Sequence, residues 1–320
     1  MHKVIFTANT FSDKKIESLK EQGIEIIKQP HNLSESELVN VLQDVEGYIL
    51  GGDEIATRTV IESANKLKII AFLGAGYERY IDVAAAKEKG VIVTNTPGAN
   101  SQAVAEFTVS LLLDSVKKTS YLNQVAKNGG WEKKQVWNLQ GKTVGIIGMG
   151  NIGSKVAYIL NKGFGMNVLY VSRSSKPEIE QSLGVQKTTL NELLANSDVV
   201  SIHASQSNET VGMIGEKELA LMKKSAVLIN PSRAEIVDGK ALYEALQNGK
   251  LAAAAFDAYY VEPLPEPEND EYKLMGLAND RFILTTHNAY NSSDAVEAME
   301  KMIEESLTSV FSGEKPKYSI

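Results

Sequence analysis

The chain of 320 residues contains no cysteine. Disulfide bonds, a thiolate nucleophile and zinc sites built on cysteine are therefore excluded, and an intracellular enzyme fits this composition best. The amino terminus, MHKVIFTANT, has the pattern of a strand and lacks the apolar core and small-residue cleavage site of a signal peptide. We expect a cytoplasmic protein, and we predict no metal site.

Long hydrophobic runs and an excess of positive charge are missing as well. No stretch approaches the ~18 apolar residues of a membrane-spanning helix. The net charge is −7, which argues against a basic surface for nucleic acid or anionic membranes. The hydrophobic fraction of 43% and the charged fraction of 23% are ordinary for a globular protein. We therefore expect neither nucleic acid nor a membrane among its partners.

Short apolar segments alternate with helical patterns over residues 1–98. The expected strands are Val4–Ala8, Ile24–Lys28, Gly47–Leu50, Leu67–Phe72 and Val91–Asn95. The expected helices include Ser12–Glu21, Ser34–Gln43, Thr57–Ala64 and Val83–Lys89. Alternation of this kind predicts a parallel sheet covered by helices on both faces. Pro97 and Gly98 end the series, because these two residues together interrupt regular structure.

A second alternating series begins at Lys142. Its expected strands are Val144–Gly148, Val168–Ser172, Val199–His203, Ala226–Asn230, Ala252–Asp257 and Phe282–Thr286. Its expected helices include Ser154–Lys162, Leu190–Ala195, Glu216–Met222 and Lys240–Gln247, and a last helix covers Ser293–Phe311. The acidic, proline-rich stretch Glu262–Asp270 is expected to be a loop. The predicted fold class is α/β, with two doubly wound parallel-sheet domains and the active site in a cleft between them.

The most informative motif opens the second series. An apolar strand leads directly into Gly148-x-Gly150-x-x-Gly153, and a helical pattern follows at once. In a dinucleotide-binding turn, the first glycine permits the tight turn, the second lets the backbone approach a pyrophosphate, and the third lets helix and strand pack closely. The helix N-terminus then offers free N–H groups to the phosphates. An ordinary glycine-rich turn is the alternative, but the strand and helix on either side favour a nucleotide site.

A long helix is expected from Ser101 to Lys127. Its apolar positions form a wide stripe that must be buried: Val104, Phe107, Leu111, Leu112 and Val116. This stripe makes a homodimer a reasonable expectation.

Three chemically active residues follow strands of the second series: Arg233, Glu262 and His287. Ligands gather at the carboxyl ends of parallel strands. An arginine can hold a carboxylate through two hydrogen bonds, and a histidine oriented by a carboxylate is a common acid or base. Each residue alone also has a structural explanation, as a solvated side chain or a satisfied core group, and the spacing does not decide between the two.

The motifs taken together resemble the D-isomer-specific 2-hydroxyacid dehydrogenases. The resemblance runs nearly end to end, through NTPGANSQAVAE at 95–106, GKTVGIIGMGNIG at 141–153, the run from 209 to 242, AFDAYYVEP at 255–263 and TTHNA at 285–289. It implies that Arg233 binds the substrate carboxylate, that His287 donates a proton to the substrate carbonyl, and that Glu262 pairs with His287. The formate dehydrogenases of the family lack this glutamate, so Glu262 argues against that branch.

The resemblance also implies the domain organisation. A flavodoxin-like substrate domain would comprise residues 1–98 and 291–320, and a Rossmann cofactor domain would comprise 99–290. Ala75, Gly76 and Tyr77 would bind the substrate carboxylate through their backbone. The cofactor would contact a set of residues along the second domain: Gly148, Gly150, Asn151, Ile152, Gly153, Ser172, Arg173, Ser174, His203, Ala204, Ser232 and Asp257.

The chain departs from the family pattern at three places. Ala234 stands where glycine is usual after the arginine, and Thr286 stands where proline usually precedes the histidine. The loop after His203 reads ASQSNET instead of a run of the His-x-Pro-Leu-Thr type. The first two changes leave the functional side chains in place, whereas the third weakens any transfer of that loop's contacts.

The second Rossmann strand predicts the cofactor preference. It ends at Ser172, where an acidic residue would normally bind the adenine ribose of NAD, and Arg173 and Ser174 follow. An acid would repel the 2′-phosphate of NADP, whereas arginine and serine can bind it. We therefore expect NADP(H) to be preferred, with NAD(H) possible and a non-selective basic turn as the plain alternative.

The leading hypothesis is an NADPH-dependent reductase of small 2-oxo acids such as glyoxylate or hydroxypyruvate, giving the D-2-hydroxy acid. An NAD-linked D-lactate or phosphoglycerate dehydrogenase is a second enzymatic hypothesis, although the end of the chain at Ile320 leaves no room for an added regulatory domain. A non-catalytic, nucleotide-sensing corepressor is a hypothesis of another class. The sequence does not reveal the 2-oxo acid, the direction of the reaction or the pathway.

Overall fold

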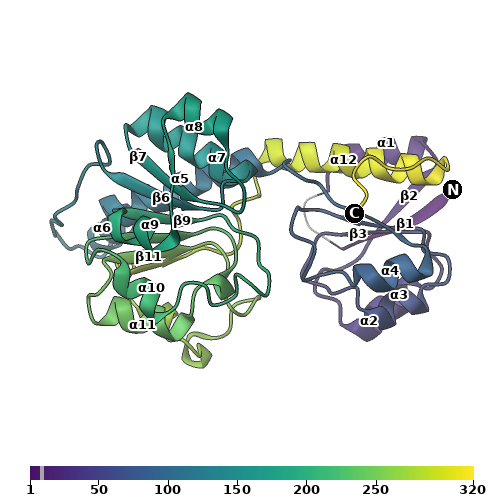
Figure 1. Ribbon diagram of the computed structural model, residues 1–320. Helices are drawn as coiled ribbons and strands as arrows, with labels where there is room; N and C mark the ends of the chain where they lie inside the picture. Colours follow the sequence, from purple (N-terminus) through teal and green to yellow (C-terminus); the bar gives the residue numbers. More distant parts are fainter. Residues whose placement is uncertain (8–10) are drawn as a thin grey trace. The chain divides into compact units, whose positions relative to one another are not determined.

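The chain folds into two compact units, each built on one parallel sheet. The computed structural model describes residues 1–7 and 11–320. Unit 1 comprises Met1–Asn100 and Asn291–Ile320, and unit 2 comprises Ser101–Tyr290 (Figure 1). Five parallel strands form the first sheet and seven form the second, which confirms the predicted fold class. Ala8, the end of the first expected strand, lies outside the described residues.

The sheet of unit 1 has the strand order β2-β1-β3-β4-β5. Its strands are β1 (His2–Thr7), β2 (Ile24–Lys28), β3 (Gly47–Leu50), β4 (Ile69–Phe72) and β5 (Ile92–Thr94). Its helices are α1 (Asp13–Glu21), α2 (Glu35–Leu42), α3 (Arg58–Ser63), α4 (Val83–Lys89) and α12 (Ser293–Phe311). Side-chain caps at Ser12, Ser34, Thr57, Asp82 and Ser292 begin these five helices, because a side-chain oxygen accepts one of the first free N–H groups.

Helices cover both faces of this sheet. Tyr48, Leu50 and Ile70 point from the strands into a core shared with α2, α3 and α4. On the other side lie α1 and α12 (Figure 1), and α12 packs against β4 with Ile303 and Leu307 fully buried. Successive strand residues therefore serve opposite faces, as a strand buried on both sides requires.

Unit 2 has the strand order β12-β11-β10-β9-β6-β7-β8. Its strands are β6 (Thr143–Ile147), β7 (Asn167–Val171), β8 (Gln186–Lys187), β9 (Val199–Ile202), β10 (Val227–Asn230), β11 (Ala253–Phe256) and β12 (Phe282–Leu284). Its helices are α5 (Ser101–Lys117), α6 (Thr119–Lys127), α7 (Asn151–Tyr158), α8 (Pro177–Leu183), α9 (Leu190–Asn196), α10 (Glu216–Leu221) and α11 (Gly239–Gln247). Four short helical turns complete the unit: η1 (Ile159–Gly163), η2 (Ala234–Ile236), η3 (Pro267–Asn269) and η4 (Leu274–Gly276). The sequence did not lead us to expect α8 or β8.

Two hydrophobic cores sandwich the sheet of unit 2. Ile146 and Ile229 belong to the core that includes α5 and α7. Their neighbours Ile147 and Leu228 belong to the core that includes α9, α10 and α11. Alternate strand residues therefore pack into opposite cores. This packing on both faces supports the loops at the carboxyl edge of the sheet.

The expected helix of 101–127 is wrong in one respect: it is two helices. Lys118 separates α5 from α6 and has a positive φ of 58°. The carboxylate of Asp114 accepts hydrogen bonds from the Thr119 hydroxyl and the Ser120 N–H, and so caps α6 from within α5. A side chain that satisfies the first N–H groups of a new helix favours a break at this point.

The apolar stripe of this region is buried within its own unit and not, as expected, against a second chain. Val104, Leu111, Leu112 and Val116 are buried in unit 2, and Phe107 packs against its core. The stripe therefore needs no second chain to cover it. By contrast, α6 has no buried residue at all.

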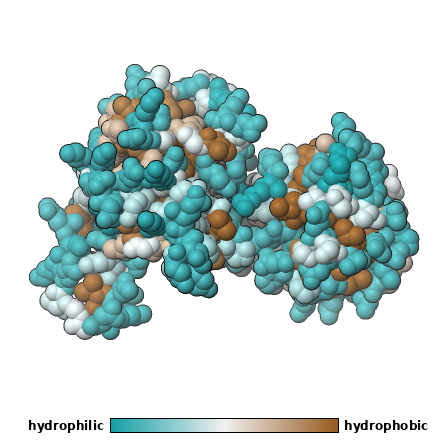
Figure 2. All heavy atoms as spheres, turned by 90° about the horizontal axis from the view of Figure 1, so that it is seen from below, coloured by the Kyte–Doolittle hydropathy of each residue, from teal (hydrophilic) through white to brown (hydrophobic). Residues whose placement is uncertain are grey.

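The visible surface in Figure 2 is mostly hydrophilic, with hydrophobic side chains in small separate patches. Across residues 1–7 and 11–320, no helix has the length and apolar character needed to cross a bilayer.

Candidate active site

The glycine turn joins β6 to α7, as the motif predicts. Gly148 has a positive φ of 98°, and a Cβ placed on it would meet the backbone of His203 and Ala204 at 2.6 Å. A Cβ on Gly153 would lie 2.0 Å from the carbonyl oxygen of Gly148. Nothing lies within 4 Å of the corresponding position on Gly150, so the backbone there is open to a ligand. The turn thus has the close packing and the open backbone that a pyrophosphate needs.

The strand order places this turn at a topological switch point. From β6 the chain moves to β7 and β8 on one side, then returns to place β9 on the other side of β6. Open parallel sheets bind ligands at such points, outside the carboxyl ends of the strands. Asn151 and Ile152 form the first turn of α7, whose free N–H groups lie at the start of the helix. Ala204 follows β9 closely, and its backbone lies against the glycine turn.

A basic turn follows β7 at the same edge. Ser172, Arg173 and Ser174 lie there, and Arg173 is exposed. The buried Tyr170 hydroxyl accepts the N–H of Lys176 at 2.9 Å and donates to the carboxylate of Glu180. These two hydrogen bonds, which sequence reasoning missed, tie the end of the turn to β7. No carboxylate forms an ion pair with Arg173 among the residues that the structure describes.

Arg233, His287 and Glu262 lie within reach of one another. Arg233 follows β10, and its Nη1 lies 3.4 Å from Nε2 of His287. Nδ1 of His287 lies 3.2 Å from Oε2 of Glu262. A guanidinium can only donate, so in the neutral ring Nε2 is the acceptor and Nδ1 carries the proton that faces Glu262. The order Arg233–His287–Glu262 is therefore a continuous line of polar contacts.

The carboxylate of Glu262 is mostly covered, with 13% of its side chain exposed. Burial favours the neutral carboxyl. The hydrogen bond and charge of His287, the N–H of Tyr259 and the charge of Arg233 outweigh it and hold the pKa of Glu262 below its ordinary value. Glu262 is thus a carboxylate at neutral pH, with both oxygens engaged: Oε1 accepts the N–H of Tyr259 at 3.1 Å.

Asp257, which was expected to contact the cofactor, holds a loop of the protein itself. Its side chain is fully buried. Its carboxylate accepts hydrogen bonds from the hydroxyl of Thr285 and from the N–H groups of Asn288 and Ala289. Its carbonyl accepts the N–H of His287 at 2.6 Å. Asp257 therefore fixes the loop that carries His287, and its enclosed carboxylate leaves little room for direct contact with a ligand.

His203 and Ser232 lie at the carboxyl edge of the same sheet. The hydroxyl of Ser232 donates to the Ile202 carbonyl at 2.7 Å, joining the ends of β10 and β9. Nε2 of His203 lies 2.8 Å from the Ser201 hydroxyl. Burial lowers the pKa of His203 to about 3, so the ring is neutral. In the described part of the chain its buried Nδ1 has no hydrogen-bond partner, and a bound group at this edge can satisfy it.

The expected substrate loop belongs to unit 1. Ala75, Gly76 and Tyr77 follow β4, and the loop is tied to the neighbouring one: Asn95 donates its side-chain amide to the Ala75 carbonyl at 3.0 Å. The N–H of Thr96 donates to the Gly74 carbonyl at 2.9 Å. Ala75 is exposed. The loop is thus a fixed turn at the carboxyl edge of its own sheet.

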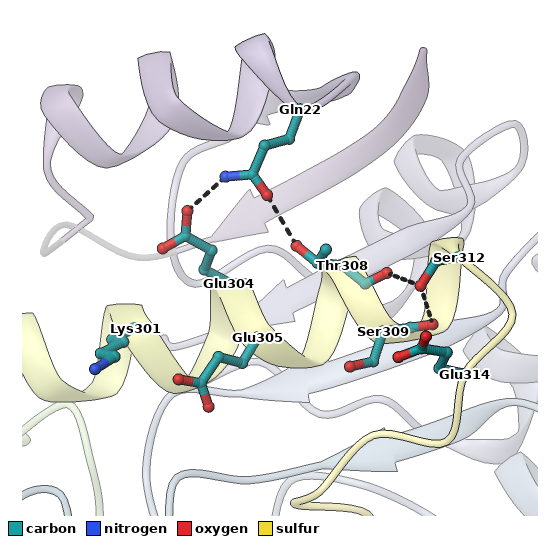
Figure 3. Close-up of a pocket in the computed structure, with 8 residues that line it drawn as sticks. All are labelled: Gln22, Lys301, Glu304, Glu305, Thr308, Ser309, Ser312 and Glu314. Carbon is teal, nitrogen blue, oxygen red and sulfur yellow. Dashed lines mark hydrogen bonds between the residues drawn. The ribbon is translucent and has the colours of Figure 1, made fainter.

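A separate hollow of about 360 Å³ lies along α12 in unit 1 (Figure 3). Its most prominent carboxylate, that of Glu304, accepts hydrogen bonds from Lys15, Ser18 and Gln22. These contacts join α1 and its C-terminal cap to α12, so Glu304 has a structural role. Elsewhere too, no cluster of three or more metal-binding side chains occurs among the described residues.

A parallel sheet with a glycine turn at its switch point, and an arginine, a histidine and a glutamate beside it, defines a nicotinamide-dependent oxidoreductase. Residues 109–289 match the family model for "D-isomer specific 2-hydroxyacid dehydrogenase, NAD binding domain". The chain belongs to the D-isomer-specific 2-hydroxyacid dehydrogenase family. It is an NAD(P)-dependent enzyme, as the resemblance in sequence predicts.

Relatives agree with this assignment along the whole chain. The glyoxylate reductase of Thermococcus litoralis is 36% identical over 312 residues, covering 95% of this chain and 91% of the relative. The D-3-phosphoglycerate dehydrogenase of Archaeoglobus fulgidus is 33% identical over 97% of this chain. This chain spans only 57% of the length of that relative.

Solved structures show the same fold. The TT0316 protein from Thermus thermophilus has a TM-score of 0.90 and 33% identity, with 99% of both chains covered. An acyclic imino acid reductase, Bsp5, solved in complex with NADPH and D-Arg, has a TM-score of 0.85 and 29% identity, again with 99% of both chains covered.

The glycine turn generates a direct prediction. Gly153→Ala should weaken NADPH binding at least tenfold, because its Cβ cannot fit 2.0 Å from the Gly148 carbonyl oxygen and the turn must shift. NADPH affinity measured by fluorescence titration checks this. Gly163→Ala is the matched control, since nothing lies within 4 Å of a Cβ there. Equal affinities for the two variants would contradict the prediction.

Proposed function

We propose that the enzyme is an NADPH-preferring reductase of small 2-oxo acids, of the glyoxylate or hydroxypyruvate type, giving the D-2-hydroxy acid. The contact line Arg233–His287–Glu262 is the observation that carries this proposal. It joins a group that binds carboxylates, a group that can donate a proton and a carboxylate that orients it. The relative named glyoxylate reductase supports the substrate class.

The glycine turn and the basic turn fit the cofactor, and when bound the reduced nicotinamide supplies a hydride to the carbonyl carbon of the substrate. Arg233 holds the substrate carboxylate and polarises the carbonyl. His287, in its protonated form, donates the Nε2 proton to the carbonyl oxygen, so that the 2-oxo acid, one hydride and one proton give the 2-hydroxy acid. Glu262 accepts a hydrogen bond from Nδ1 and fixes the orientation of the ring.

We further propose that unit 2 binds the dinucleotide. The backbone N–H groups of Ala75, Gly76 and Tyr77 would bind the substrate carboxylate. Asp257 would act on His287 through the loop that it holds. The residues around the cofactor would be those of the glycine turn and of the neighbouring strand ends: Gly148, Gly150, Asn151, Ile152, Gly153, His203, Ala204 and Ser232.

The preference for NADPH rests on the turn after β7. Ser172 cannot repel a 2′-phosphate, and the exposed Arg173 can pair with it. The hydrogen bond from the Lys176 N–H to the Tyr170 hydroxyl restrains this turn. A turn that is already restrained loses less conformational entropy when the cofactor binds.

D-3-Phosphoglycerate dehydrogenase is a second candidate, favoured by the 33% identity to the Archaeoglobus relative. A panel of glyoxylate, hydroxypyruvate, pyruvate and 3-phosphohydroxypyruvate, each with NADPH and with NADH, separates the two. Highest kcat/KM with the phosphorylated substrate would replace our proposal, and no turnover with any of them would favour a binding protein.

Arg173→Ala should lower kcat/KM for NADPH roughly ten- to hundredfold, because a hydrogen bond to a charged group contributes about 1.5–3 kcal/mol. Use of NADH should change little. Steady-state kinetics with both cofactors checks this. Lys162→Ala, which removes an exposed cation elsewhere in unit 2, should leave the NADPH/NADH ratio at the wild-type value. An equal loss with both cofactors would show that Arg173 does not bind the 2′-phosphate.

His287→Ala should lower kcat for reduction by roughly 10²–10⁴, the usual contribution of a positioned acid. NADPH affinity should survive. The lowered pKa of Glu262 keeps the pair intact at neutral pH, and its contribution disappears only as pH falls through that lowered value. Wild-type reduction should therefore keep its rate on the acid side until the pH falls below the ordinary glutamate pKa of 4.5, and a pH–rate profile checks this.

Glu262→Gln removes the carboxylate that accepts from Nδ1 of His287, so kcat for reduction should fall and the loss of rate on the acid side of the profile should disappear. Glu266→Gln, at another position of the same loop, is the control. A wild-type kcat in His287→Ala would assign the proton to another group. If the pH–rate profile of Glu262→Gln equals that of the wild type, Glu262 does not act on His287, but His287 remains the proposed proton donor.

We propose that the chain forms a homodimer through α6 and the segment 128–136. This surface contains Trp131, which is 92% exposed, and Val136, which is 40% exposed. Exposed tryptophan is costly in water and is enriched at the centres of interfaces. Light scattering at micromolar concentration should give about twice the chain mass of 34.9 kDa.

Trp131→Lys should shift that mass toward the monomer. Val211→Lys, at a position that is 52% exposed in the same unit, should not. A wild-type protein that is monomeric, or a Trp131→Lys variant with the wild-type mass, would contradict this interface.

A further inference from the structure

The loop that carries Glu262 contains a buried acid with no part in the chemistry above. Residues 257–281 connect β11 to β12, and most of this long connection is irregular. Asp270 lies within it, with only 6% of its surface exposed. A carboxylate buried in a surface loop is costly unless its oxygens are satisfied.

Asp270 is satisfied by three donors within the loop. Its Oδ1 accepts the hydroxyl of Tyr259 at 2.6 Å and the N–H of Tyr272 at 3.1 Å. Its Oδ2 accepts the N–H of Met275 at 2.9 Å. The contacts join the start of the connection, at Tyr259, to its later part at 270–275. The buried carboxylate of Asp270 thus ties the two parts of the loop together.

Tyr259 links the Asp270 carboxylate to the pair formed by Glu262 and His287. The residue is 2% exposed and belongs to the same core as α10 and α11. Burial first, and then the hydrogen bond to Asp270, raise the pKa of Tyr259, so its hydroxyl keeps its proton and remains a donor. Its backbone N–H donates to Oε1 of Glu262, and Oε2 of that carboxylate faces His287.

We propose that Tyr259 and Asp270 are positioning residues for the proton donor, and that they act by fixing the peptide N–H that orients Glu262. The proposal rests on the assignment of His287 and Glu262 as the acid and its partner. If the hydroxyl of Tyr259 is lost, the ring and its own peptide gain freedom, and the N–H that donates to Glu262 is held less firmly. Proton donation then suffers, whereas the glycine turn, at another strand end, is untouched.

The test compares Tyr259→Phe with Tyr260→Phe. Both remove one tyrosine hydroxyl from adjacent residues, and that of Tyr260 donates to the Val237 carbonyl instead of to Asp270. Tyr259→Phe should lower kcat for reduction about three- to tenfold, as expected when a support of a catalytic group is loosened. The KM for NADPH should stay within about twofold. Tyr260→Phe should keep the wild-type kcat, whatever it does to the melting temperature.

A double variant separates positioning from plain destabilisation. In the Glu262→Gln background the carboxylate to be oriented is gone, so Tyr259→Phe should cause no further loss of kcat. The same loss in both backgrounds, or equal effects of Tyr259→Phe and Tyr260→Phe, would overturn the inference. A wild-type kcat in Glu262→Gln itself would instead overturn the proposed role of Glu262. Asp270→Asn, which retains the shape but places an amide against N–H donors, should reproduce the loss in kcat.

Discussion

The arrangement of the candidate site depends on one buried carboxylate, that of Asp257. It accepts three hydrogen bonds from residues 285–289, and the carbonyl of the same residue takes the N–H of His287. His287 has a positive φ of 53°, a conformation that costs a residue with a side chain about 1–3 kcal/mol. The hydrogen bonds of Asp257 offset this strain and keep the imidazole between Arg233 and Glu262. Without them the loop would relax, and the line of polar contacts would open.

Much of the fold follows from the spacing of apolar residues. Strands such as Val199–Ile202 are entirely apolar or small and buried on both faces, so their type and position could be predicted without long-range information. The break at Lys118 could not, because apolar periodicity continues through it and the cause is the capping carboxylate of Asp114. The short β8, Gln186–Lys187, is two exposed polar residues whose pairing with β7 leaves no pattern in the sequence.

The candidate site, like the fold, could be predicted from the sequence only in part. Parallel strands end at one edge, so Arg233, Glu262 and His287 could be expected near one another from their places after strands, although their roles stay predictions. The contacts of Asp257 were not foreseen, since nothing in the sequence shows that residues 285–289 turn back toward it. Likewise, Tyr259 and Asp270 stand 11 positions apart in an irregular connection. Their contact follows from how the loop closes, which neither propensity nor periodicity describes.

Three departures from the local rules of protein structure occur at the carboxyl edge of the sheet in unit 2. A histidine in the left-handed region, a buried histidine nitrogen without a partner in the described part of the chain and a glycine with no room for a Cβ all lie at the carboxyl ends of the strands. The remainder of this sheet, with its two sandwiching cores, shows regular alternation and buried apolar side chains. Backbone strain persists where the surrounding structure fixes it, and such positions are often found at functional sites. Because these three departures lie at the same edge as the line Arg233–His287–Glu262, they support an active site there independently of any resemblance.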